Sequence, residues 1–404
     1  MDFTFTEEQQ AAVEAARAVF AGVAPDGVPS PALTPGAVAD DFDRPLWARL
    51  AAGDLLSLVL APEHGGAGLD AIALCLVLRE SAKVLARVPL LEHCATAMAV
   101  QAHGADALAA ELLPDAGRGA LVLTAAAHGR TGHDPAELAV TARPDPGTST
   151  STSTSAGTAA GTTPGTGTGT GGWVLDGVQT AVPGAHSADW IAVPAHTGED
   201  GSGAVLALVP RTAEGLTLAE QYSTSGERLA ELTLDAVRVP AHRLIETPGA
   251  WEDLRRLLAT GTCALALGLG EGVLTMTSQY TSKREQFGFP VATFQAVAVQ
   301  AADRYIDLRA MEVTLWQAAW RLEHPGSGGP LPAAGDVAVA KIWAAEGVRR
   351  VVQTAQHLHG GFGADTDYPL HRYHAWAKQL ELQLGPAAAH EEALGDLLAA
   401  HPLA

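Results

Sequence analysis

Two short stretches decide how this chain is interpreted: Arg284-Glu285-Gln286-Phe287-Gly288 and His357-Leu358-His359-Gly360-Gly361-Phe362-Gly363. Arg284 follows a long helical pattern, and a guanidinium fixed at a helix end can hold phosphate oxygens through two parallel hydrogen bonds. The pair Gly360-Gly361 lets the backbone approach a ligand more closely than side chains would permit. Alone, each feature has an ordinary explanation, because such an arginine can pair with Glu285 and a glycine pair usually caps a helix.

The composition bounds the class of protein. At 404 residues the chain can bury a large core, and its length suggests two or three domains. Apolar residues make up 47% and charged residues 17%, with Ala in long blocks, which is typical of a largely α-helical, enzyme-sized protein. The net charge of −20 repels nucleic-acid backbones, so nucleic-acid binding is not expected and a phosphate-bearing ligand needs a local basic pocket.

Cysteine usage and hydropathy argue against a disulfide-bonded, a metal-binding and a membrane-spanning protein. Cys75, Cys94 and Cys263 lie far apart without CxxC spacing, which disfavours a disulfide framework and a structural zinc site, and no histidine spacing suggests a metal. No run approaches the roughly 20 apolar residues of a membrane-spanning helix, and the N-terminus is acidic rather than basic. We therefore expect a cytoplasmic protein that does not bind a membrane.

Helical patterns flank a β-rich middle. Helices are predicted from Glu7, capped by Thr6, to Phe20, and over residues 43–52 and 71–85. Short β-branched runs, separated by Gly, Pro and Asp, then predict strands at 120–124, 138–141, 173–175, 190–193, 204–209 and 232–240. Long helices with short connections, at 251–283, 293–322, 336–358, 369–384 and 386–400, imply an antiparallel bundle. The predicted fold is mainly α with a central β-domain, divided into residues 1–118, 119–245 and 246–404.

Residues 147–172 form a low-complexity stretch inside the β-domain. They are almost entirely Thr, Ser, Gly and Ala, which cannot bury enough apolar surface to offset the chain entropy lost on ordering. We expect a disordered hairpin loop, more simply explained as a tolerated surface insertion than as a lid or tether.

Five segments at matching intervals resemble the acyl-CoA dehydrogenase family and together span nearly the whole chain. They are residues 3–9, the turn Ala61-Pro62-Glu63-His64-Gly65-Gly66-Ala67-Gly68, the β-domain exit Val237-Arg238-Val239-Pro240, the stretch 284–288 with Phe294-Gln295, and the stretch 357–363 with Asp367-Tyr368-Pro369. The resemblance implies an N-terminal helical domain, a small β-barrel or sandwich, a C-terminal four-helix bundle and an FAD cofactor.

The resemblance also assigns cofactor contacts, residue by residue: Arg284, Phe287, Gln295, His357, Gly360, Gly361 and Thr124. In the family the arginine reaches the flavin of a neighbouring subunit. His357 stands where many relatives have Gln, and is either a cofactor contact or a buried, satisfied histidine. The β-domain departs from the family, because Thr-Glu-Pro of the first flavin-contact loop is Thr124-Ala125-Ala126 here and Trp-Ile-Thr of the second is Ala181-Val182-Pro183.

The family's catalytic carboxylate is missing. The family removes a proton α to a thioester carbonyl while hydride passes from the β-carbon to the flavin, which requires a positioned carboxylate base. The two positions where relatives carry this base are Leu384 and Leu258 here. Glu271, Asp253 and Glu381 are possible substitutes, of which Glu381, three residues before Leu384 on the same predicted helix, is the least unfavourable. A surface or ion-paired role is the simpler expectation for each.

Three functions therefore stay open. The first is a flavin-dependent acyl-thioester dehydrogenase subunit whose base comes from a homologous partner, as in the actinobacterial heterotetrameric acyl-CoA dehydrogenases that this chain resembles. The second is a self-sufficient, homo-oligomeric enzyme of secondary metabolism with atypical flavin chemistry, and the third is a non-catalytic scaffold subunit. The thioester is carried by CoA or by a carrier protein, which could dock at Arg255 and Arg256, although these can instead pair with Glu252 and Asp253. An electron-transfer flavoprotein is a possible partner.

Overall fold

The structure is a computed structural model that describes residues 4–25, 27–132, 138–145, 171–198, 203–327 and 329–402. The predicted loop over residues 147–172 lies outside the described residues as far as position 170. Its last residue, Gly172, is not part of a loop, because a strand begins there.

The N-terminal part is helical, and its first helix begins at the predicted cap. Helix α1 (Glu7–Phe20) begins after Thr6, whose hydroxyl accepts from the Gln9 amide while the Gln9 side chain accepts from the Thr6 amide. Helix α2 (Arg44–Ala52) is capped by Asp43 and α3 (Ala71–Lys83) by Asp70. Helix α3 ends two residues before the predicted boundary, because Leu85 adopts a positive φ of 50°.

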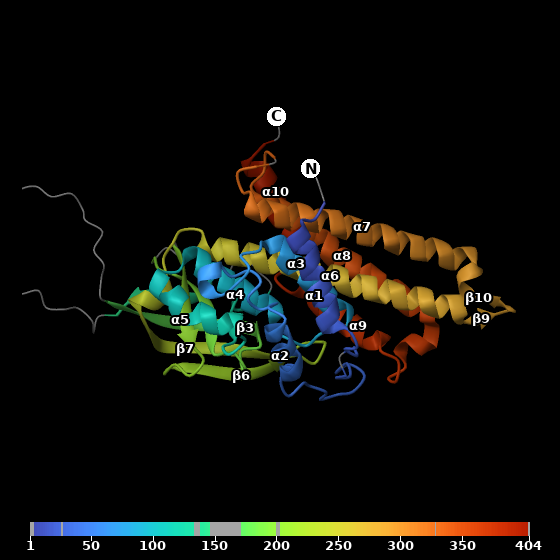
Figure 1. Ribbon diagram of the computed structural model, residues 1–404, viewed down its shortest axis with the longest axis horizontal. Helices are drawn as coiled ribbons and strands as arrows, with labels where there is room; N and C mark the ends of the chain where they lie inside the picture. Colours follow the sequence, from blue (N-terminus) through green and yellow to red (C-terminus); the bar gives the residue numbers. More distant parts are fainter. Residues whose placement is uncertain are drawn as a thin grey trace, which may run out of the picture.

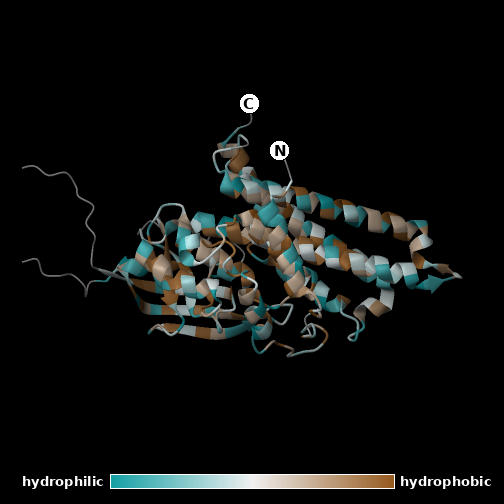
Figure 2. Ribbon diagram, in the orientation of Figure 1, coloured by the Kyte–Doolittle hydropathy of each residue, from teal (hydrophilic) through white to brown (hydrophobic). Residues whose placement is uncertain are grey.

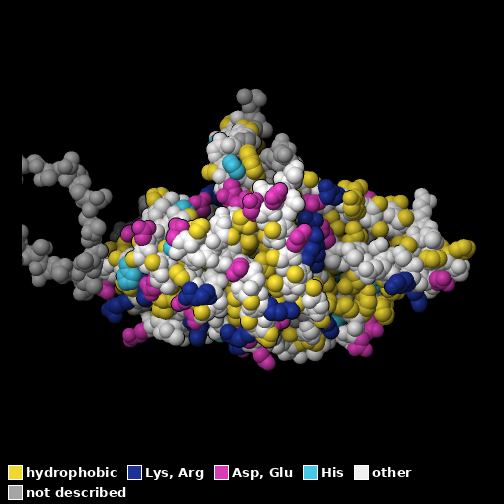
Figure 3. All heavy atoms as spheres, viewed as in Figure 1, with side chains coloured by type: hydrophobic (Ala, Val, Ile, Leu, Met, Phe, Trp, Pro, Cys, Tyr) yellow, Lys and Arg dark blue, Asp and Glu magenta, His cyan; other side chains and the backbone are white. Residues whose placement is uncertain are grey.

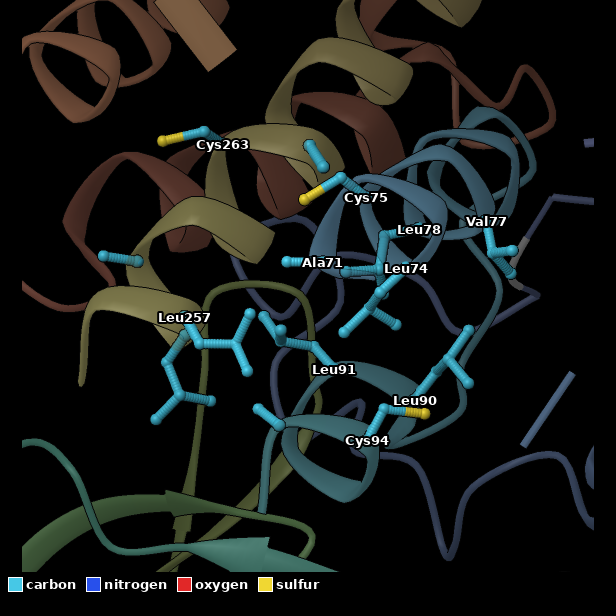
Figure 4. Close-up of a cluster of buried hydrophobic side chains, with 14 of the residues drawn as sticks. Ala71, Leu74, Cys75, Val77, Leu78, Leu90, Leu91, Cys94, Leu257 and Cys263 are labelled. Atoms are coloured by element: carbon cyan, nitrogen blue, oxygen red, sulfur yellow. The ribbon is translucent and has the colours of Figure 1, made fainter. Parts of the chain in front are cut away.

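Two further helices, α4 (Leu90–His103) and α5 (Asp106–Gly117), have no counterpart among the predicted elements. Helix α4 is buried on nearly every side, so its sequence lacks the polar stripe that marks an amphipathic helix. Its Leu91 lies close to Leu257 and Leu74 in a core that α3, α4 and α6 share (Figure 4).

The β-domain is one sheet in the strand order β6-β7-β3-β2-β4-β5-β8, with β1 pairing in parallel with β4. No sequence pattern predicts β6, because it is a largely exposed edge strand with polar residues among its apolar ones. Strand β3 extends well beyond the predicted 173–175, since it pairs with β7 along its length. The strands are β1 (Leu123–Ala125), β2 (Val140–Pro144), β3 (Gly172–Pro183), β4 (Trp190–His196), β5 (Ala204–Pro210), β6 (Leu216–Tyr222), β7 (Arg228–Pro240) and β8 (Leu244–Ile245).

The C-terminal part consists of α6 (Ala250–Lys283), α7 (Gln295–Glu323), α8 (Ala333–His359), α9 (Leu370–Leu382) and α10 (Ala387–Ala400). The long helices α6, α7 and α8 lie side by side and extend away from the β-domain to a free end, where the hairpin of β9 (Glu285–Gln286) and β10 (Phe289–Pro290) lies (Figure 1). The predicted class, mainly α with a central β-domain, is confirmed.

Within the described ranges, α6 is the one helix long and apolar enough to span a membrane by length and composition. Buried residues make up 78% of its most apolar window, as expected for the central helix of a folded core. Helix α7, at the edge of the bundle, shows hydrophilic and hydrophobic residues interspersed along its length (Figure 2). The apolar character of α6 is therefore explained by its packing against α3, α4 and α8.

Candidate active site

The free end of the bundle carries three of the predicted cofactor contacts. Helix α6 ends at Lys283, and Phe287 and Gly288, both with positive φ, turn the chain into the β9–β10 hairpin. Arg284 is exposed, and among the described residues no carboxylate lies within ion-pair distance of its guanidinium. The expected alternative, a pair with the neighbouring Glu285, is therefore not formed. Phe287 is 91% exposed, and Gln295 begins α7 with an exposed side chain.

The end of α8 carries three more predicted contacts. His357 is exposed, so the alternative of a buried, satisfied histidine is wrong for this residue. Gly360 adopts φ 60° and ψ −139°, a conformation essentially restricted to glycine. Gly361 has no positive φ, and a Cβ built on it would meet no described atom within 4 Å. Nothing in the described part of the chain therefore requires glycine at position 361.

Thr124, the seventh predicted contact, lies on β1 in the β-domain. The β-domain and the β9–β10 hairpin stand at opposite ends of the molecule (Figure 1). Thr124 is fully buried, and its hydroxyl donates to the Pro183 carbonyl at 2.6 Å, so this bond joins the two loops that the resemblance identifies as flavin contacts. Within one chain, the seven predicted residues therefore lie in separate regions. Six are near the ends of α6 and α8, and Thr124 is in the β-domain.

A cavity of about 300 Å³ lies where the β-domain meets α9. Ala181 and Pro183 of the second predicted flavin loop line it, and so does His128, which is buried and has no hydrogen-bond partner for Nδ1 among the described atoms. Burial lowers the pKa of His128 to about 4, with nearby Lys341 contributing, so the ring is neutral at pH 7. Sequence reasoning missed His128, because an isolated histidine carries no signal of its own.

Both positions of the missing base are buried inside the protein. Leu258 is 3% exposed on α6, and Leu384 is 2% exposed just after α9. The prediction that Glu381 and Leu384 share a helix is wrong, because α9 ends at Leu382 and Leu384 adopts a φ of 57°. Glu381 instead pairs with Lys378 at 2.6 Å.

The other two substitutes considered for the base are also ion-paired. Glu271 pairs with Arg79, and Asp253 pairs with Arg256 and with His103. These contacts match the ion-paired roles expected from the sequence. The pair between Asp253 and Arg256 also matches the alternative to a docking role for that arginine.

Glu92, on helix α4, is a carboxyl that sequence reasoning did not consider. It is buried and accepts a hydrogen bond from Nε2 of Gln383, the residue that precedes Leu384, at 3.4 Å. Burial raises the pKa of Glu92 to about 7, and the nearby charge of Glu227 contributes in the same direction. Glu92 and Gln383 are 291 residues apart in the sequence, so no spacing rule could have linked them.

A second cavity, of about 390 Å³, lies between α4, α6 and α7. Met98 and Leu257 supply apolar walls, while His103 and Arg256 supply polar groups. Leu257 precedes the base position Leu258, so this cavity is next to that part of α6. Among the described residues, no cluster of three or more His, Cys, Asp or Glu side chains could hold a metal ion.

Two family models match the helical parts of this chain. The family described as "Acyl-CoA dehydrogenase, N-terminal domain" matches residues 6–120, and "Acyl-CoA dehydrogenase, C-terminal domain" matches residues 257–398. Acyl-CoA dehydrogenase FadE27 from Mycobacterium tuberculosis is 34% identical over 365 residues, which cover 89% of this chain and 90% of FadE27.

Two solved structures are similar over nearly the whole chain. The ChsE4-ChsE5 complex from Mycobacterium tuberculosis contains a chain with 33% identity and a TM-score of 0.84, with 100% of both chains covered. A variant of the Tcur3481-Tcur3483 steroid ACAD contains a chain with 36% identity and a TM-score of 0.83, with 98% of both chains covered.

Proposed function

This chain belongs to the acyl-CoA dehydrogenase family, and from that premise we propose that it is an FAD-binding subunit for the α,β-desaturation of an acyl thioester, with the base supplied by a homologous partner subunit. One contrast carries the proposal. The predicted cofactor contacts at the free end of the bundle are exposed, whereas both base positions are apolar and buried.

The free end suits the pyrophosphate of FAD. Arg284 offers a guanidinium without an ion-pair partner in the described part of the chain, and Gly360 and Gly361 offer backbone without side chains. Gln295 and His357 add exposed hydrogen-bonding groups. Because the β-domain is at the other end of the molecule, these residues would hold an FAD whose flavin ring lies against a neighbouring subunit. When bound, FAD supplies the acceptor for the hydride that leaves the β-carbon.

The β-domain offers space for a flavin ring in this chain. The cavity of about 300 Å³ and the Nδ1 atom of His128, for which no described atom is a partner, would accommodate a polar ring edge. Thr124 would keep the two loops together through its bond to Pro183 rather than by contacting the ring directly. A neutral His128 can donate or accept a hydrogen bond there without adding charge.

The cavity of about 390 Å³ suits an acyl thioester. Its apolar walls fit an acyl group, and Arg256 at its edge fits a phosphate of CoA or of a carrier protein. Asp253 already pairs with Arg256, so a bound phosphate would compete with that carboxylate. The leucines at both usual base positions cannot remove the α-proton, which supports a base from the partner. An electron-transfer flavoprotein is the proposed electron acceptor.

Glu92 favours a second candidate, a self-sufficient enzyme. Its buried carboxyl accepts a hydrogen bond from Gln383, the residue before Leu384, and therefore lies near that base position. A carboxyl with a pKa of about 7 can both accept and release a proton near neutral pH. This candidate predicts thioester oxidation by the purified chain alone, lost in Glu92→Gln.

The deciding experiment expresses the chain alone and together with its neighbouring homologous gene product. The flavin absorbance spectrum and electron transfer from acyl thioesters to an artificial acceptor are measured in both cases. The partner-base proposal expects activity only in the co-expressed complex, and loss of activity when the partner's base is replaced. A stable, fully active homo-oligomer would contradict it, and a colourless complex would indicate a scaffold.

A further inference from the structure

The cavity of about 390 Å³ between α4, α6 and α7 contains a buried guanidinium that the proposed function does not use. Arg321, near the end of α7, lines this cavity and is only 2% exposed. The side chains of His103, Arg256 and Asp253, which also line it, are 15%, 26% and 50% exposed, and Glu323 is exposed as well. Arg321 is therefore the most buried polar group of the cavity wall and marks its inner end.

The guanidinium of Arg321 has contacts that fix its position and leave one nitrogen over. Nη2 donates to the Leu331 carbonyl at 2.7 Å, and Nε lies 2.9 Å from the carboxylate of Asp336 on α8. Nη1 makes no hydrogen bond to any residue that the structure describes. A buried N–H group that has lost water without gaining an acceptor costs free energy. A ligand with an acceptor at the inner end of the cavity would remove this cost.

The remaining walls of the cavity are mainly apolar. Met98, Leu254, Leu257 and Leu322 are among the side chains that form them. A plain hydrocarbon chain would fit these walls but would leave Nη1 of Arg321 without an acceptor. An acyl chain with an oxygen atom at its far end would match both the walls and the guanidinium.

The charges around the cavity favour an uncharged oxygen over a carboxylate. Arg256 is already paired with Asp253, and Arg321 with Asp336, while Glu323 adds a further negative charge to the wall. A carboxylate on the ligand would therefore be buried without a cation of its own, which is costly. The chain as a whole carries a charge of −20, and acidic side chains accompany the basic ones across the face shown in Figure 3. The overall field of the protein thus does not attract an anionic acyl group either.

We propose that Arg321 selects acyl thioesters whose acyl group carries an uncharged oxygen, as a ketone or a hydroxyl group, at the end away from the thioester. The inference rests on the proposed function, in which this cavity holds the acyl group. Nη1 would donate a hydrogen bond to that oxygen, and no proton or electron is transferred. Hydrogen bonds to charged groups correspond to a preference of about 10- to 100-fold over a chain that lacks the oxygen.

The test compares three kinds of thioester on the co-expressed complex. Hexanoyl-, octanoyl- and decanoyl-CoA are each compared with the derivative that bears a ketone on the penultimate carbon and with the dicarboxylic thioester of the same length. Calorimetry measures binding, and electron transfer to an artificial acceptor measures kcat/KM. At one or more chain lengths the ketone is expected to bind at least about tenfold more tightly than the plain chain, and the dicarboxylic thioester is expected to bind more weakly than the ketone.

Arg321→Lys is the deciding variant, because its ammonium can still pair with Asp336 but lacks the second arm of the guanidinium. It should abolish the preference for the ketone and leave binding of the plain chain unchanged. The matched control is Arg349→Lys, an ion-paired arginine of α8 that does not line the cavity, which should keep the preference.

The possible failures are distinguishable. Equal binding of ketone and plain chain at every length, or tightest binding of the dicarboxylic thioester, would refute the selection by Arg321 and leave the proposed function standing. An equal loss for all thioesters in Arg321→Lys would show that Arg321 only holds α7 against α8. If the wild-type complex neither binds nor oxidises any of these thioesters, the proposed function itself fails.

Discussion

At the scale of single residues, the two adjacent glycines have different reasons to be glycine. Gly360 needs its backbone conformation, with φ 60° and ψ −139°, whereas Gly361 has an ordinary φ and open space where a Cβ would stand. The backbone conformation thus explains why residue 360 is glycine. At residue 361, close approach of a ligand or partner would explain the absence of a side chain.

Substituting each glycine by alanine should separate these roles. Gly360→Ala is expected to destabilise the fold by about 1–3 kcal/mol, because alanine is strained in that conformation. Gly361→Ala should change stability by less than about 0.5 kcal/mol yet weaken nucleotide binding. Thermal unfolding and ADP titration of both variants check this, and equal effects of the two changes on stability would contradict it.

The raised pKa of Glu92 predicts a pH dependence of stability. Its folded pKa of about 7 is raised above the ordinary 4.5, so the native state binds an extra proton between these values and stability falls as pH rises through them. Glu92→Gln resembles the protonated form and should remove this loss. The variant should therefore gain up to about 3 kcal/mol over wild type between pH 5 and 8, at about 1.4 kcal/mol per pKa unit.

Urea unfolding at several pH values measures the difference. Glu14→Gln, at an exposed position of α1, is the control and should show no such dependence. A Glu92→Gln variant that is uniformly less stable than wild type would show that the carboxyl is charged and satisfied in the native state.

At the scale of elements, the end of α9 is fixed by a buried cation on α8. Lys341 is fully buried, and its Nζ donates to the carbonyls of Leu380, Glu381 and Gly385 at 3.3, 3.3 and 3.0 Å. A positive charge at a helix C-terminus opposes the negative end of the helix dipole. Lys341 thereby positions the turn that contains Leu384.

Replacing this lysine should loosen that turn. Lys341→Met leaves three carbonyls without this donor and is expected to cost about 2–5 kcal/mol of stability. Lys378→Met, which removes a partly exposed cation from α9 itself, should cost less than about 1 kcal/mol. Hydrogen exchange of the amides around residues 383–385 should be faster in Lys341→Met alone. Slow, unchanged exchange there would refute the positioning role.

At the scale of the whole molecule, buried neutral histidines join its parts. His93 connects α4 to β1, accepting from the Leu123 amide at 3.2 Å, and His390 on α10 donates to the Leu384 carbonyl at 2.9 Å. Burial lowers the pKa of His93 to about 4, and burial together with the charge of Lys341 lowers that of His390 to about 4. Burial likewise lowers the pKa of His128, which lines the cavity of the β-domain, to about 4.

These histidines predict sensitivity to acid. Their folded pKa values lie below the unfolded value of 6.5, so the unfolded state binds more protons between pH 6.5 and 4, and stability is lost as pH falls through this window. Each histidine contributes a slope of up to about 1.4 kcal/mol per pH unit. Unfolding free energies of wild type and His390→Gln are measured at pH 4–7. Their slopes against pH should differ by the contribution of one histidine, up to about 1.4 kcal/mol per pH unit, and parallel curves would contradict the prediction.

Sequence patterns alone predicted the order of helical and β-rich parts and the family, because these depend on local periodicity and on contiguous motifs. They also located the cap of the first helix at Thr6, since a cap lies within a few residues of the groups that it satisfies. Elements without a local pattern were not predictable: α4 is apolar on all sides, and β6 is an exposed edge strand.

Which residues share a site could not be predicted from the sequence and depends on how the chain packs. The tertiary structure placed Thr124 in the β-domain and Arg284 at the far end of α6, in different parts of the molecule. It buried the leucines at both base positions, and it brought Glu92 beside Gln383. These relationships join residues far apart in the chain, and packing alone brings such residues together or keeps them apart.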